Sequence, residues 1–341
     1  MIRLQLSPIT TVQQAQAMLQ TAINVEFGTL PPYLYAQLTI LPGTNAAAMA
    51  RLKSITHQEM IHLCLAANIL NALDGDDTPE GKPTLQPPTY PGPLPGDIGS
   101  DGKVLTVHIL PFGKPAMQQG MNIEMPVDPI DFPQLKLLAA TTSKAVTIGQ
   151  FYEALDAYLK TLPASAWSSN NRQIADKQFF PGQLFAVNNY EDAHNAIQVI
   201  ISEGEGTSND PLDFSKELAH FYRFEEMYRN QVLTSSDSPQ GFSWGGPLGV
   251  NYSEVYPAIA DPQTHDFSKE PAAARLAQDA CTKAYSAMVD ALNLAFRGDM
   301  AQLGIAVRKM FDLRMAAVEA LHTPLADKSK VAGPAFIYKK I

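Results

Sequence analysis

The residues best suited to chemistry in this chain are glutamates and histidines that interrupt apolar helical stripes. A charge on a buried helix face is costly unless it is paired or bound to a metal ion. Glu59 and His62 form an ExxH pair, whose i, i+3 spacing lets a carboxylate and an imidazole reach one ion. Glu26 lies on the apolar stripe of the preceding helical segment. These residues indicate a metal site between helices.

Two later segments extend the pattern. Glu153 has the small neighbours Gly149 and Ala157 at i−4 and i+4, which would leave room for ligands beside the helix. Glu217 and His220 form a second ExxH. Taken singly, each motif is common by chance. Their order, Glu then ExxH then Glu then ExxH on successive helices, is typical of bundles that hold two iron or manganese ions.

The ligand types indicate which metal the site would hold. Carboxylate oxygens with one imidazole per ion favour iron, with manganese possible, whereas zinc sites of this kind usually contain thiolates or more histidines. Two such ions could together activate dioxygen, which no side chain does alone. We expect the side chains of the glutamates and histidines to converge within a few ångströms. If Glu26 or Glu153 faced solvent, at most a mononuclear site would remain.

The Gly204-Glu205-Gly206 element interrupts the fourth helical segment. Glycine on both sides of Glu205 lowers helix stability. A continuous helix could not present both Glu205 and His220, about four turns apart, to one site. We expect the break to turn Glu205, rather than Glu203, toward the metal. A glycine-rich helix end with a solvated glutamate is the alternative, and the carboxylate ligand of this region is left open among Glu203, Glu205 and Glu217.

Apolar periodicity predicts the elements that position these residues. The predicted helices span residues 11–38, 44–73, 143–162, 190–202, 211–232, 270–296 and 300–321. Pro31 and Pro32 should kink or split the first helix. A strand is predicted at 103–110, inside a proline-rich segment. The sequence therefore predicts an all-α single domain, 1–341, with a bundle core at 11–74 and 139–232, a loop and short-strand insertion at 75–138, and extra C-terminal helices at 268–323.

The amino-acid composition excludes some classes of binding partner. The net charge is −9 and the sequence pI is near 5.3, with only short basic pairs, which argues against nucleic acid and anionic membranes. Cys64 and Cys281 are far apart, so neither a disulfide framework nor a thiolate site is expected. The start of the sequence lacks a signal-peptide pattern, and no apolar run reaches membrane-spanning length. We expect a cytoplasmic protein, able to form a homo-oligomer.

Five segments carry a resemblance to a known family. They are AINVEFGTLPPY at 22–33, HQEMIH at 57–62, SEGEGT at 202–207, LAHFYRF at 218–224 and AGPAF at 332–336. The chain resembles bacterial ferritin-like proteins related to the iminophenyl-pyruvate dimer synthase domain of violacein and rebeccamycin biosynthesis. The resemblance implies a ferritin-like four-helix bundle with an iron centre and, in characterised members, oxidative coupling of two amino-acid-derived imines. Gln is expected in relatives where this chain has Glu203, which favours Glu205 as the ligand.

Two functions follow as hypotheses. The first is a non-haem, di-iron oxidoreductase that uses dioxygen on a small amino-acid-derived imine or aromatic substrate, bound under the proline-rich loop and the aromatic residues near Trp244. The second is an iron-binding or storage-type protein without an organic substrate. A large part of the chain lies outside the predicted four-helix bundle, in loops and extra helices. This additional structure favours a substrate pocket over a simple storage bundle. A metal-free structural bundle would leave several buried carboxylates unpaired and ranks last.

Overall fold

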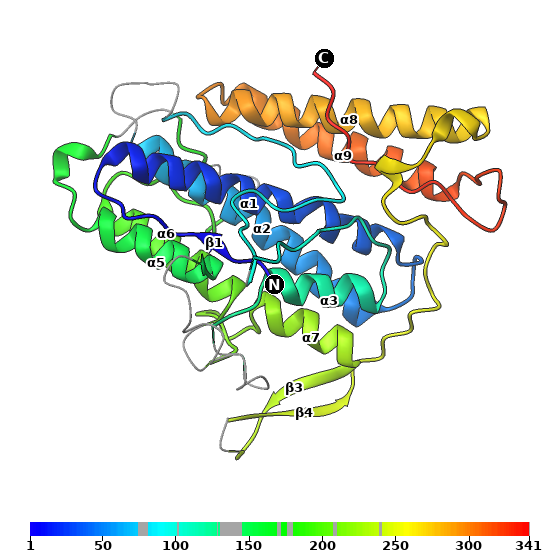
Figure 1. Cartoon of the computed structure of the whole chain (residues 1–341), viewed down its shortest axis with the longest axis horizontal. Helices are drawn as coiled ribbons and strands as arrows, with labels where there is room; N and C mark the ends of the chain where they lie inside the picture. The colour runs from blue at the N-terminus through cyan, green and yellow to red at the C-terminus, as the bar shows by residue number, and fades with distance from the viewer. Residues whose placement is uncertain are drawn as a thin grey trace.

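The centre of the molecule is a bundle of helices from separate parts of the chain. The computed structural model describes residues 1–73, 81–100, 102–127, 129, 145–168, 172–175, 180–206, 210–238 and 241–340. Helices α1 (Val12–Thr39) and α2 (Ala46–Ala72) pack along each other, and α5 (Ile148–Leu159) and α6 (Tyr190–Gly204) form a second pair against them. Figure 1 shows α5 and α6 below the α1–α2 pair. The all-α helix bundle expected from the sequence is thus present.

Helix α1 continues through Pro31 and Pro32, so the expected split does not occur. Pro32 has no N–H and cannot bond the carbonyl of Gly28, four residues earlier. The Tyr90 hydroxyl, from the proline-rich insertion, donates to that carbonyl at 2.6 Å. The insertion therefore satisfies the backbone group that the proline leaves open. It supports the turn of α1 that follows Glu26.

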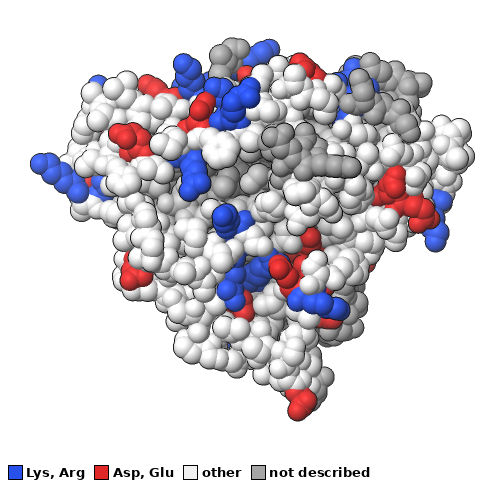
Figure 2. Space-filling model, turned by 180° about the vertical axis from the view of Figure 1, so that it is seen from behind, with Lys and Arg blue, Asp and Glu red and all other residues white. Residues whose placement is uncertain are grey.

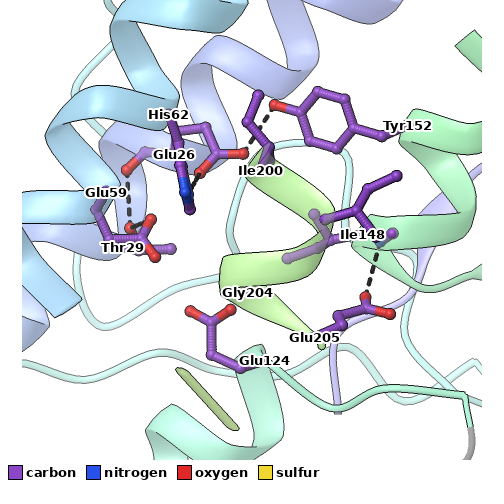
Figure 3. A pocket seen from close by; sticks show the side chains of 12 residues that line it. Glu26, Thr29, Glu59, His62, Glu124, Ile148, Tyr152, Ile200, Gly204 and Glu205 are labelled. Carbon is purple, nitrogen blue, oxygen red and sulfur yellow. Dashed lines mark hydrogen bonds and ion pairs between the residues drawn. The ribbon is translucent and has the colours of Figure 1, made fainter. Parts of the chain in front are cut away.

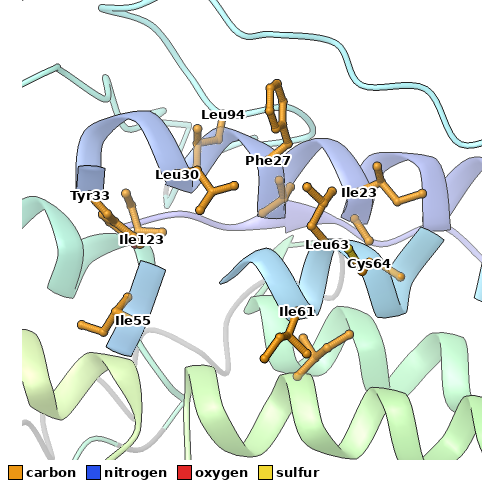
Figure 4. Close-up of a cluster of buried hydrophobic side chains, with 14 of the residues drawn as sticks. Ile23, Phe27, Leu30, Tyr33, Ile55, Ile61, Leu63, Cys64, Leu94 and Ile123 are labelled. Carbon is orange, nitrogen blue, oxygen red and sulfur yellow. The ribbon is translucent and has the colours of Figure 1, made fainter. Parts of the chain in front are cut away.

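Helices α1 and α2 each bury apolar side chains in the core of the molecule. Ile23, Phe27 and Leu30 of α1 and Ile55 and Leu63 of α2 are buried (Figure 4). Full burial of one such side chain contributes about 1.5–3 kcal/mol to folding. This packing fixes the relative positions of the two helices that carry the first glutamates and the first histidine.

The insertion differs from the prediction. The strand expected at 103–110 is wrong, since Lys103 and Val107 make only isolated bridges, with Ser100 and Gly92. Helix α3 (Lys114–Ile123), in a stretch read as a loop, packs against α7 (His220–Arg229). At Gly120 of α3 a Cβ atom would lie 2.6 Å from the Phe224 ring, so only glycine permits this close approach.

The strands form two small antiparallel pairs. The first pair is β1 (Leu4–Gln5) with β2 (Ala145–Val146), and the second is β3 (Gln231–Ser235) with β4 (Phe242–Pro247). The helix expected at 211–232 is helical only over α7 and continues as β3. Short 3₁₀ turns are η2 (Ala164–Ala166), η3 (Pro262–Thr264) and η4 (Phe267–Lys269). Residues 143–144 of the third predicted helix lie outside the described residues.

The C-terminal helices α8 (Ala272–Phe296) and α9 (Ala301–His322) form a hairpin beside α1 (Figure 1). Their bounds are close to those predicted. Over the described ranges no helix is long and apolar enough to cross a membrane. On the face shown in Figure 2, basic and acidic side chains are interspersed with uncharged surface.

Candidate metal centre

Three side chains converge between α1 and α2. One ligand atom from each of Glu26, Glu59 and His62 lies within 4.8 Å of the other two. All three residues are at most 4% exposed. Figure 3 shows them pointing toward one another from the two helices. The i, i+3 spacing on α2 therefore places a carboxylate and an imidazole where they can reach one ion.

A second group of ligands shares one residue with the first. Glu59, Glu124 and His220 also offer ligand atoms within 4.8 Å of one another, and all are buried. Glu124 follows the end of α3, and His220 is the first residue of α7. Glu59 thus stands between two adjacent positions, each completed by one further glutamate and one histidine. The set contains the ligand types of a dinuclear carboxylate centre.

The contact between His220 and Glu59 tests whether these residues fit a metal ion. His220 Nδ1 lies 2.8 Å from Glu59 Oε1, yet within the described residues this buried nitrogen has no hydrogen-bond partner. The two atoms approach without the alignment of a hydrogen bond. A nitrogen and a carboxylate oxygen that face the same space in this way could both bind one cation. The cation would then be the partner that the buried nitrogen lacks.

Hydroxyl groups orient the carboxylates. Tyr152 donates to Glu26 Oε1 at 2.8 Å, and Thr29 donates to Glu59 Oε2 at 2.8 Å. Tyr33 donates to Glu124 Oε1 at 2.6 Å. Each buried glutamate therefore has one oxygen held by a neutral donor. The outer hydrogen bonds restrict the rotamers of the ligands before any ion is bound.

Burial perturbs the carboxyl groups strongly. Burial, and then the neighbouring Glu59, raises the pKa of Glu26 to about 8. Burial also raises the pKa of Glu59, and burial and the charge of Glu59 raise the pKa of Glu124 well above its usual range. Three carboxylates cannot easily ionise together in a site that excludes water. Cations between them would remove this penalty.

The two histidines are perturbed in opposite directions. Burial lowers the pKa of His62, but its hydrogen bond to Glu203 and the nearby carboxylates outweigh that and raise the pKa to about 9. Burial, followed by the proximity of His62 and Arg223, lowers the pKa of His220. The two imidazoles therefore sit in different electrostatic surroundings although both face Glu59.

Glu153 does not face this cluster. It is exposed, while Tyr152 and Leu155 occupy the buried face of α5. The small neighbours at i±4 therefore do not mark the inward side of the helix, and the predicted orientation is wrong. With Glu153 exposed, the ligand set predicted from the sequence would support at most a mononuclear site, and a second ion would need a carboxylate that the sequence did not indicate. The carboxylate that takes this place in the cluster is Glu124.

Glu124 is not among the predicted ligands, because it lies in the insertion at 75–138, which is predicted as loop and short strand. Its signal in the sequence is faint but present. Met121, Ile123 and Met125 surround it and are all buried, so a single acid stands in an apolar run. An ionisable group in such surroundings needs a partner.

Glu217 also lies outside the cluster. Its side chain is 63% exposed and pairs with Arg223 at 3.2 Å. It precedes the first turn of α7, so Glu217 and His220 are not on one helix and do not form an ExxH pair in the predicted sense. His220 reaches the site because α7 begins there.

Glu205 lies beside the cluster but outside both groups of ligands. It is the C-terminal cap of α6, and its carboxylate accepts from the Thr147 hydroxyl at 3.0 Å and the Gly149 N–H at 2.7 Å. It thus caps the N-terminus of α5, where a negative charge is favourable. Burial raises its pKa to about 7. The glutamate of this break that contacts a histidine is Glu203, whose Oε2 lies 2.8 Å from His62 Nε2.

A cavity opens beside the cluster. Its lining includes the ligands Glu26, Glu59, His62 and Glu124, with Ile148, Ile200, Ile201, Tyr152 and Glu205 among the remaining walls (Figure 3). One side is therefore acidic and the other largely apolar. Trp244, expected near the substrate, lies instead on β4, with the Arg229 guanidinium 4.6 Å from its ring.

Fold and site together define a helix bundle with a buried carboxylate–histidine cluster that can bind metal. A family model described as "Ferritin-like" matches residues 19–229, more than half of the chain, and the chain belongs to that family. A solved ferritin-like protein from Caulobacter vibrioides is similar over 98% of this chain and 100% of that one, with a TM-score of 0.64 and 20% identity. This likeness concerns the fold. No curated protein matches the chain.

Proposed function

We propose that this protein is a non-haem metalloenzyme that binds two metal ions and uses dioxygen to oxidise a small organic substrate. Iron is the metal that we propose. The observation that carries the proposal is the position of Glu59, shared by two buried ligand groups of equal composition. Each group offers hard carboxylate oxygens and one imidazole, which suits iron or manganese. The resemblance to imine dimer synthases suggests an amino-acid-derived imine or an aromatic substrate.

The residues of the chain would hold the ions and balance their charge. Glu26, Glu59, Glu124 and Glu203 supply four carboxylates within or directly against the cluster, as many negative charges as two divalent ions carry positive ones. Two bound iron ions would supply the redox chemistry with dioxygen that side chains lack. The apolar wall of Ile148, Ile200 and Ile201 excludes water and offers contact to a substrate.

Metal reconstitution tests the proposal. Metal-free protein would be loaded anaerobically with Fe²⁺, desalted and analysed for metal, and then mixed with oxygenated buffer. We expect two ions per chain and oxygen uptake that increases when small imines or aromatic amino-acid derivatives are added. The exposed Glu153→Gln variant is the matched control and should behave as the wild type. Stoichiometric zinc with neither iron nor manganese, after expression in balanced medium, would contradict the choice of metal.

An iron-binding protein without an organic substrate is the second candidate. The acidic side of the cavity, with Glu124 and Glu205 beside the ligands, would also suit the passage of cations. The same assay separates the two. Oxygen uptake that stops once the added Fe²⁺ is oxidised, whatever organic compound is present, favours iron handling.

A further inference from the structure

The two histidines of the cluster use their outer nitrogens differently. Both turn Nδ1 toward the carboxylates, with His62 Nδ1 3.8 Å from Glu26 and His220 Nδ1 2.8 Å from Glu59. His62 Nε2 contacts the Glu203 carboxylate at 2.8 Å. His220 Nε2 contacts the side-chain amide oxygen of Gln58 at 3.1 Å. The outer partner is therefore anionic at one histidine and neutral at the other.

The contacts of Gln58 fix which atom faces His220. Arg223 Nη1 donates to Gln58 Oε1 at 2.8 Å, and a guanidinium can only donate, so the atom it meets is the amide oxygen. Because Gln58 Oε1 can only accept, His220 Nε2 must carry the hydrogen. Nδ1 of the neutral ring then keeps its lone pair toward the metal position.

Arg223 is itself held firmly in place. It is 4% exposed, and it donates to the Leu218 carbonyl and, at 2.8 Å, to the Ser54 hydroxyl. Asp213 lies 3.7 Å away as a buried counter-charge. The guanidinium is thus a fixed anchor that keeps the amide from rotating, and it adds a positive charge behind His220.

We propose that Gln58 and Arg223 are positioning residues that hold His220 as the Nε2–H tautomer and make the metal position at His220 the weaker of the two. The proposal rests on the proposed dinuclear centre. Each position has one glutamate of its own, the shared Glu59 and one histidine, so the direct ligands are matched. The difference must come from the outer partners. A carboxylate behind an imidazole strengthens it as a ligand, whereas an amide with a cation behind it does so less.

The tautomer can be measured without any metal. Two-bond ¹H–¹⁵N spectra of metal-free protein labelled at histidine report which ring nitrogen carries the hydrogen. For His220 we expect Nε2–H in the wild type. In Gln58→Leu, which cannot accept a hydrogen bond, the hydrogen should move to Nδ1 and face Glu59. Wild-type protein with Nδ1–H at His220 would overturn the assignment, even if every variant failed to fold.

A calorimetric titration with Mn²⁺ tests which of the two positions binds the metal more tightly. We expect two binding events of unequal affinity. Gln58→Leu should weaken the weaker event about 10–100-fold, the usual effect of removing an outer partner, and change the tighter one far less. Glu203→Gln should weaken the tighter event instead. This crossed pattern is what a general loss of structure would not produce.

The matched control is Gln278→Leu on α8. Gln278 is also buried, donates to the Gly333 carbonyl and accepts from Ala335 N–H at 3.0 Å, far from the cluster in sequence and on another helix. Both affinities should stay at wild-type values. Equal affinities in the wild type, or equal losses of both in Gln58→Leu, would overturn the ranking. Protein that binds no Mn²⁺ and no iron would overturn the ranking and the proposed function together, while the tautomer result would still decide the role of Gln58.

Discussion

At the scale of single residues, substitution of Glu59 should reduce metal binding more than substitution of any other ligand. Glu59 belongs to both ligand groups, so Glu59→Gln should reduce metal content from two ions to one or none, whereas a change at a single position should remove one. The Thr29 hydrogen bond can persist to the amide oxygen, so the fold should survive. Metal analysis and circular dichroism of the same samples would check this. Two retained ions in Glu59→Gln would show that it is not shared.

The pH dependence of stability follows from Glu26. Its carboxyl pKa is raised from 4.5 in a solvated chain to about 8 in the metal-free fold, chiefly by burial. The folded state then binds more protons than the unfolded state between these values, so the free energy of unfolding is highest below about pH 4.5 for this group and falls as pH rises through 8. We expect denaturant titrations of metal-free protein to show this loss between pH 6 and 8.

Metal ions should cancel that loss, because they replace the protons on the carboxylates. Metal-loaded protein should therefore keep or gain stability over the same range, and Glu26→Gln should make the curve of the metal-free protein less steep, with the other groups of raised pKa still contributing. A metal-free wild type that grows more stable from pH 6 to 8 would contradict the raised pKa of Glu26.

At the scale of elements, the sequence predicts the long helices and the candidate ligands that lie on them. Glu26, Glu59 and His62 sit on α1 and α2, whose apolar stripes are long enough for the period of 3.6 to be read. The sequence does not reveal Glu124, because α3 is only ten residues long and contains Gly120 in its interior, so its helical signal is weak. Helices of this length owe their stability to tertiary packing, here against α7, which the local sequence does not record.

The break after α6 gives an element-scale prediction about Glu205. The sequence favoured it as a ligand, but in the structure it caps α5 through Thr147 and Gly149. Glu205→Gln should therefore keep two bound ions, and it should cost little stability at neutral pH, because burial already raises the pKa of this carboxyl to about 7. Metal analysis with denaturant titration would check both. Loss of one ion would return Glu205 to the ligand set.

The contact between Gly149 and Glu205 also shows that Glu205 packs against the start of α5. A Cβ atom at Gly149 would lie 2.8 Å from Glu205 Oε2, closer than nonbonded atoms allow. Gly149 makes room for Glu205 and not, as its spacing predicts, for ligands beside Glu153. Periodicity could locate the glycine, but only the three-dimensional arrangement shows which carboxylate needs it.

At the scale of the whole molecule, the ligands tie together parts of the chain that are distant in sequence. They come from α1, α2, the end of α3 and the start of α7, with Glu203 of α6 directly behind. An ion that binds only the folded state stabilises it by mass action, about 2.7 kcal/mol at a hundred times the dissociation constant. Binding should thus couple these elements into one cooperative unit.

Hydrogen exchange followed by mass spectrometry can detect this coupling. On addition of Mn²⁺ to metal-free protein, amide exchange should slow in α1, α2, α3, α6 and α7, because their opening now requires loss of the ion. The α8–α9 hairpin and the β3–β4 pair carry none of the ligands described above and should change little, so they serve as internal controls. Uniform slowing over the whole chain would indicate a general effect of the ion. Slowing confined to α1 and α2 would leave a single position at Glu26, Glu59 and His62, and the bridging role of Glu59 would have to be given up.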